Sequence, residues 1–118
     1  MRELAYYAAL ESTPESYHER LSINDRFHLA VAAGAQNGLL LDQVRRCLTQ
    51  HDRVLSLGIV YAVQPTSVPQ HHHIVDAIER RDPAGARAAM TSHLEDSFRL
   101  VMDLISSGRI RGLHRSSA

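Results

Sequence analysis

Apolar residues recur along the chain at the three-to-four-residue spacing of an α-helix, and no stretch alternates apolar and polar residues as a half-buried strand would. Thr13 followed by Pro14 pairs a capping hydroxyl with a proline at the first helical position, which predicts a helix over residues 13 to 35. Asp82 followed by Pro83 predicts a last long helix over residues 82–106 in the same way. The pattern therefore predicts an all-α domain built as an antiparallel helical bundle.

The remaining elements follow from where the periodicity stops and resumes. Asn37 and Gly38 interrupt it, and a second long helix is predicted over residues 39–61. Residues 64–69 are rich in turn formers and are predicted to connect to a third helix over residues 70–80. Residues 3–10 suggest a short first helix, and residues 108–118 suggest a frayed tail. No internal repeat is present, so the prediction is one domain over residues 1–118 with a core of about 8–105.

Polar residues occur on the faces that should point into the bundle. Residues four apart on a helix lie one above the other, so Asn24 and His28 share a face, which also carries apolar residues. In the last helix His93 lies on a stripe of small and apolar residues, which predicts that it points inward. The predicted inward stripes consist of Tyr17, Leu21, Asn24, His28 and Val31 in the first long helix, and Ala86, Ala89, Met90, His93 and Leu100 in the last.

The third helix begins with three consecutive histidines, of which helical geometry selects one. His71 shares its face with Ile74, Val75 and Ile78. His72 and His73 are rotated from that face by about 100° and 200°, so they are predicted to lie on the rim or surface. The triplet is internal and leads directly into apolar positions, which distinguishes it from a terminal purification tag.

Composition narrows the classes of function. Thirteen basic and thirteen acidic side chains give a formal charge of zero, so the chain by itself is not expected to bind duplex DNA. The single cysteine, Cys47, excludes an internal disulfide and is expected to be a small core residue. No apolar run is long enough to span a membrane, and no signal peptide is evident, so the expected location is the cytoplasm.

Histidine is the over-represented residue, with eight copies, which suggests metal or proton chemistry. Three histidines and an amide oxygen from three helices could converge in the bundle interior, where helical proteins build metal sites. A buried histidine taken singly is more often a hydrogen-bonded core residue than a ligand, and Asn24 could pair with a backbone group. Asp25 could replace Asn24 as the oxygen ligand if the inward face of this helix lies one residue further along the chain than predicted. His18, His51 and His114 are expected to face solvent.

Two segments, NDRFHLAVAAGAQNGLL (residues 24–40) and HHHIVDAIERRDPAGARAAMTSHL (residues 71–94), together resemble the FCD domain. This domain is the all-helical effector-binding half of FadR-type GntR transcriptional regulators. The positions that carry the resemblance are Asn24, Phe27, His28, Asn37, His71, Ala77, Ile78, Asp82, Ala86, Arg87, Met90, His93 and Leu94.

The resemblance implies a divalent metal, commonly zinc or nickel, in the cavity that also receives a small carboxylate effector. The implied ligands are Asn24, His28, His71 and His93, the residues that face geometry also selects. Asn24 stands where family members frequently have an aspartate, and the loss of this charged ligand should weaken the binding of a divalent cation. Gln70 stands where they commonly have a glutamate, so a possible partner of the metal-binding histidines is neutral. The winged helix-turn-helix and the opening FCD helix of family members are not found in this sequence.

The first functional hypothesis is therefore an effector-sensing and dimerisation domain, not an enzyme, that reaches DNA only through a winged helix-turn-helix. Arg46 and Arg53, with Arg45 beside them, could pair with a ligand carboxylate, although a solvated face is the simpler interpretation. One alternative is a metal-dependent hydrolase, because three histidines with an open position could activate water. Glu95 and Asp96 are one position off the His93 face, so no well-placed base is predicted. A second alternative is a purely structural helical domain.

Overall fold

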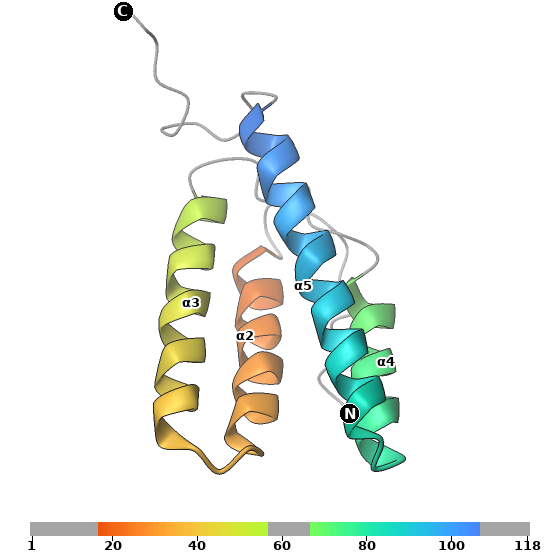
Figure 1. Cartoon of the computed structure of the whole chain (residues 1–118). Helices are drawn as coiled ribbons and strands as arrows, with labels where there is room; N and C mark the ends of the chain where they lie inside the picture. Colours follow the sequence, from red (N-terminus) through yellow and green to blue (C-terminus); the bar gives the residue numbers. More distant parts are fainter. Residues whose placement is uncertain (1–16, 57–66, 107–118) are drawn as a thin grey trace, which may run out of the picture.

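The computed structural model describes residues 17–56 and 67–106, which form four helices (Figure 1). These are α2 (Tyr17–Ala33), α3 (Gly38–Ser56), α4 (Ser67–Glu79) and α5 (Pro83–Ser106). Helices α2 and α3 form one antiparallel hairpin, and α4 and α5 form a second. The described residues contain no strand, which confirms the predicted all-α bundle. The short helix expected over residues 3–10 and the tail over 108–118 lie outside the described residues.

Side-chain caps begin two of the helices, one at Asp82, where the sequence predicted a cap, and one at Asn37, where it predicted a break in the pattern. Asn37 Oδ1 accepts hydrogen bonds from the backbone N–H groups of Leu39 at 3.1 Å and Leu40 at 3.2 Å, which caps α3. Asp82 Oδ1 accepts a hydrogen bond from the Gly85 N–H at 2.9 Å and caps α5. These side-chain acceptors satisfy backbone donors that have no partner within the first turn of a helix.

Helix α4 begins earlier than predicted. Ser67, Val68 and Pro69 were assigned to the connector, but they form its first turn. A proline is compatible with a first helical turn because its missing N–H would have no partner within the helix there. The turn-forming composition of residues 64–69 therefore misplaced the helix start by three residues.

The turn from α4 to α5 is closed by backbone hydrogen bonds. Asp82 N–H donates to the Ala77 carbonyl at 2.9 Å, and Arg81 N–H donates to the Ile78 carbonyl at 2.9 Å. Arg81 adopts a φ of 53°, the left-handed conformation that this type of helix ending requires. The arrangement sets α5 antiparallel to α4 immediately after it ends.

The core of the described bundle centres on Phe27 and Ile74, which are 2% and 0% exposed. The half-buried apolar side chains that pack against this pair are Val31, Val75, Ala89 and Met90. Ile23 and Phe27 thus occupy the buried face of α2, whereas Leu21 and Asn24 are only half-buried. The inward face predicted for α2 was therefore rotated slightly about the helix axis relative to the face that is buried in the structure.

Two apolar residues are more exposed than predicted. Cys47 was expected in the core but is exposed on α3. Ile78 was expected to face inward but is 47% exposed, and its neighbour Ala77 is buried instead. Helix α3 lies at one side of the described bundle and packs mainly against α2, so much of its surface meets solvent (Figure 1). None of the described helices is both long and apolar enough to cross a membrane.

Candidate metal centre

Three helices bring three buried histidines together. His28 comes from α2, His71 from α4 and His93 from α5, and their exposed fractions are 8%, 0% and 3%. His93 Nε2 lies 3.2 Å from His71 Nε2 and 3.3 Å from His28 Nε2. One ring nitrogen from each residue lies within 4.8 Å of the other two. We refer to these three residues as the three-histidine centre.

Aromatic packing holds the rings of the centre in place. The His71 ring stacks on Phe27 with ring centroids 4.2 Å apart and 22° between the planes. The His28 and His93 rings are nearly parallel, at 5.2 Å and 11°, and His71 meets both of them edge to face. Because Phe27 also forms the apolar core, the packing that stabilises the bundle fixes the orientation of His71 as well.

Burial keeps the centre in its neutral form. Loss of solvent lowers the pKa of His28 from 6.5 to about 4, with a smaller contribution from His93. Loss of solvent, together with the neighbouring His93, His28 and His72, lowers the pKa of His71 to about 3. Burial also lowers the pKa of His93, although Asp96 opposes the shift. Neutral imidazole is the form that binds metal ions.

The donor set fits a divalent transition metal. Two imidazole nitrogens bound tetrahedrally to one zinc ion, each at about 2.05 Å, are roughly 3.3 Å apart. The Nε2 separations of 3.2 and 3.3 Å around His93 match that spacing. Each neutral imidazole also carries one N–H group, so the same separations suit N–H···N hydrogen bonds between the rings when no metal is bound.

The fourth predicted ligand is Asn24, which lies on α2 four residues before His28. Asn24 is half-buried, and its side chain hydrogen bonds with that of Asp25. Among the described histidine, cysteine, aspartate and glutamate residues, the group of converging donors contains the three histidines and not Asp25. Whether Asn24 or Asp25 supplies an oxygen ligand stays a prediction.

A second polar cluster, between α2 and α3, was not predicted. Asp25, on α2, has its pKa raised to about 7 by burial and by a hydrogen bond and repulsion from Asp52 of α3. His51, expected to face solvent, has a side chain only 37% exposed and lies 3.8 Å from Asp52. Repulsion from a protonated His51 would add to the lowering of the pKa of His28 and His93. The sequence feature that could have predicted this cluster is the adjacent pair His51 and Asp52 within a helix of otherwise regular apolar spacing.

The other predicted residues are placed as follows. His72 and His73 are exposed, which agrees with the selection of His71 by helical geometry. Arg46 and Arg53 are exposed on α3, and Arg53 lies 3.4 Å from the side-chain oxygen of Gln50. Their role in carboxylate binding stays a prediction. Arg20, which was not predicted, is 3% exposed on α2.

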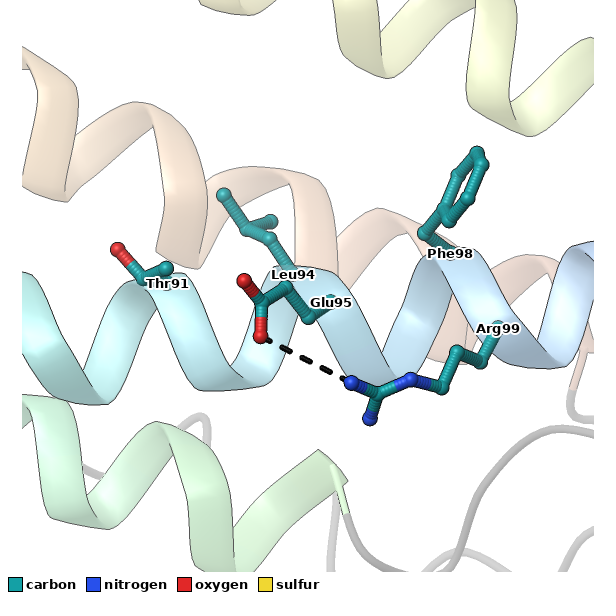
Figure 2. Close-up of a pocket in the computed structure, with 5 residues that line it drawn as sticks. All are labelled: Thr91, Leu94, Glu95, Phe98 and Arg99. Atoms are coloured by element: carbon teal, nitrogen blue, oxygen red, sulfur yellow. Dashed lines mark ion pairs between the residues drawn. The ribbon is translucent and has the colours of Figure 1, made fainter.

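A shallow pocket lies along α5 and does not include the three-histidine centre (Figure 2). Its lining residues are Thr91, Leu94, Glu95, Phe98 and Arg99. Leu94 and Phe98 project from the same side of the helix, and Arg99 lies 3.9 Å from Glu95. The pocket is therefore an apolar surface with a charged rim and holds none of the buried histidines.

Comparison with known proteins supplies an independent result. The sequence model of the FCD domain matches residues 1–96. The chain is 32% identical over 98 residues to a protein of Escherichia coli (strain K12) named "Putative L-lactate dehydrogenase operon regulatory protein", and the same values apply to its namesake in Shigella flexneri. The alignment covers 78% of this chain and 36% of each relative, so the chain spans about a third of their length. No solved structure matches.

Proposed function

The chain belongs to the FCD domain family, and from this premise we propose that it senses a small carboxylate effector for a GntR-type transcriptional regulator through a divalent metal in the three-histidine centre. One observation carries the metal part of the proposal: the ring nitrogens of three buried histidines converge, with His93 Nε2 lying 3.2 Å from His71 Nε2 and 3.3 Å from His28 Nε2. Zinc or nickel is the expected metal because imidazole nitrogen suits both.

His28, His71 and His93 would hold the metal, with Asn24 or Asp25 as the candidate oxygen donor. When bound, a metal with neutral ligands supplies a net positive charge and open coordination positions for a carboxylate oxygen. The surrounding apolar core, including Phe27 and Ile74, would exclude water and strengthen that attraction. We also propose that the chain forms a homodimer and acts in the cytoplasm. In a longer protein, a separate winged helix-turn-helix domain would bind the DNA.

The centre supports a hydrolase less well. A hydrolytic site needs a carboxylate base within reach of the metal-bound water, and the converging group among the described residues contains histidines alone. Glu95 lies on the surface with a side chain 61% exposed, and both Asp96 oxygens accept hydrogen bonds from Gln70 and Arg99. We therefore propose a non-enzymatic role.

The test is a titration of metal-free protein with Zn²⁺ and with Ni²⁺ by calorimetry, followed by titration with L-lactate in the presence and absence of the metal. L-lactate is the first effector to try because of the name of the relatives. We expect one metal per chain, and carboxylate binding only after metal loading. Asn24→Asp should bind metal more tightly if residue 24 is a ligand, because an anionic oxygen replaces an amide oxygen.

A matched control is His73→Ala, which removes an exposed histidine two residues after His71. It should bind metal like the wild type. Absence of metal binding by the wild type at any tested concentration would overturn the proposal and leave the histidines as core residues.

A further inference from the structure

The imidazole of His93 makes polar contacts on both of its edges. Its Nε2 faces His71 and His28 in the three-histidine centre. Its Nδ1 lies 2.7 Å from Oε1 of Gln70, a half-buried residue on α4. The side chain that touches the outer edge of His93 thus comes from a neighbouring helix.

Gln70 is in turn held by a carboxylate. Its Nε2 donates a hydrogen bond to Asp96 Oδ2 at 2.7 Å, and Asp96 Oδ1 accepts one from Arg99 Nη1 at 3.0 Å. Asp96 lies three residues after His93, so both ends of the link are on α5 and Gln70 of α4 bridges them. The result is a continuous chain of contacts, His93 to Gln70 to Asp96 to Arg99, from the buried centre to the surface.

The chemistry of each partner determines the position of each hydrogen. A carboxylate paired with arginine only accepts hydrogen bonds, so the NH₂ group of Gln70 must face Asp96. The amide oxygen of Gln70 then faces His93, and an oxygen acceptor requires a proton on Nδ1. In a neutral imidazole with the proton on Nδ1, the lone pair is on Nε2, which faces the centre.

We infer that Gln70, oriented by Asp96, is a positioning residue that holds His93 in the Nδ1-protonated tautomer and directs its Nε2 lone pair into the three-histidine centre. The consequence for metal affinity rests on the proposed function, whereas the tautomer is a property of the metal-free chain. Residues that fix the tautomer of a ligating histidine commonly change metal affinity by about 10- to 100-fold when they are replaced.

The experiment is nitrogen-15 NMR of histidine side chains in the metal-free 118-residue chain, which reports the protonated nitrogen of each ring directly. We expect His93 to carry its proton on Nδ1 in the wild type. Asp96→Asn offers Gln70 a partner that both donates and accepts, so the amide can turn over and His93 should become a mixture of tautomers. Gln70→Leu should remove the preference because it leaves His93 Nδ1 without the oxygen that accepts its proton.

Glu95→Gln is the matched control because it removes the neighbouring carboxylate, which contacts Arg99 but is not part of the link to Gln70. It should leave the His93 tautomer unchanged. In a parallel zinc titration, Gln70→Leu should weaken binding by about 10-fold or more.

The two proposals fail separately. A wild-type His93 protonated on Nε2, or an Asp96→Asn spectrum identical to that of the wild type, overturns the positioning role even if zinc binds. A wild-type His93 protonated on Nδ1 that changes as expected in Asp96→Asn supports it even if no metal binds, in which case the proposed metal function alone is lost.

Discussion

At the scale of single residues, position on a helix separates side chains that are chemically identical. His71, His72 and His73 are consecutive, yet His71 is 0% exposed and stacks on Phe27, whereas its two neighbours are exposed. Successive residues of an α-helix differ in direction by about 100°, so one face of α4 can admit only one of the three. The chemistry of the centre therefore depends on which ring faces inward.

His71→Ala should reduce metal binding and metal-induced stabilisation far more than His72→Ala. A metal at a hundredfold excess over its Kd stabilises the folded state by about 2.7 kcal/mol, and most of this gain should disappear when one of three nitrogen ligands is lost. Differential scanning fluorimetry with and without zinc would measure it. Equal losses in the two variants would show that the inward ring has no special role.

The pH dependence of stability follows from the pKa of the buried histidines. The pKa of His28 is about 4 in the folded chain and near 6.5 when the chain unfolds, because burial disfavours the charged form. As pH falls below 6.5 the unfolded state takes up the proton first, so His28 lowers stability progressively until about pH 4. Urea unfolding of metal-free protein between pH 7.5 and 4.5 should show a shallower decline for His28→Gln than for the wild type.

Asp25 acts in the opposite direction and serves as the control. Burial and Asp52 raise its pKa from 3.8 to about 7, so the folded state takes up this proton first as pH falls from 7 to 3.8, and folding is favoured. Asp25→Asn removes this compensation, and its decline with acid should be steeper than that of the wild type. Parallel curves for all three proteins would contradict both assignments.

At the scale of elements, the turn between α4 and α5 sets two residues of the centre against each other. Arg81 in the left-handed conformation ends α4, and the Asp82 side chain begins α5 by capping the Gly85 N–H. Because the two helices share this short turn, His71 on α4 and His93 on α5 face each other across the hairpin. The local cap thus contributes to the geometry of a distant site.

Asp82→Ala should destabilise the fold by about 1 kcal/mol, the usual cost of losing a side-chain cap. Asp82→Asn keeps an oxygen acceptor and should lose much less. Asp42→Ala is a suitable control because Asp42 makes only an exposed contact with Arg45 at 3.3 Å, worth about 0 to 1 kcal/mol. Chemical denaturation of the three variants would decide it, and similar losses for Asp82→Ala and Asp42→Ala would argue against the cap.

At the scale of the whole molecule, apolar side chains of α5 remain exposed. Leu94, Phe98 and Met102 are 51%, 65% and 42% exposed and recur every four residues along one side of the helix. Exposed apolar surface of this kind favours association with a partner, and the proposed function calls for a second copy of the chain.

We expect a homodimer that Phe98→Glu disrupts, because a charge would replace the largest exposed apolar side chain of this face. Leu39→Glu, at an equally apolar and 80% exposed position on α3, should remain dimeric. Sedimentation velocity at micromolar concentrations measures both. A wild-type monomer, or a Phe98→Glu dimer, would exclude this face.

The all-α architecture, the cap at Asp82, and the inward position of His28, His71 and His93 follow from the sequence. Helical periodicity is local, since each residue's direction is set by its neighbours within one turn. The resemblance to the FCD domain identified the same three histidines by a separate route, and the matching sequence model supports the family.

Other features were decided by how the helices pack together. Cys47 is exposed, Ala77 is buried in place of Ile78, and His51 is half-buried because each helix is rotated to satisfy contacts with all of its neighbours. The link from His93 through Gln70 to Asp96 joins residues more than twenty positions apart, and no local pattern encodes it. Sequence periodicity determines which side of a helix is apolar, and only tertiary packing determines what that side meets.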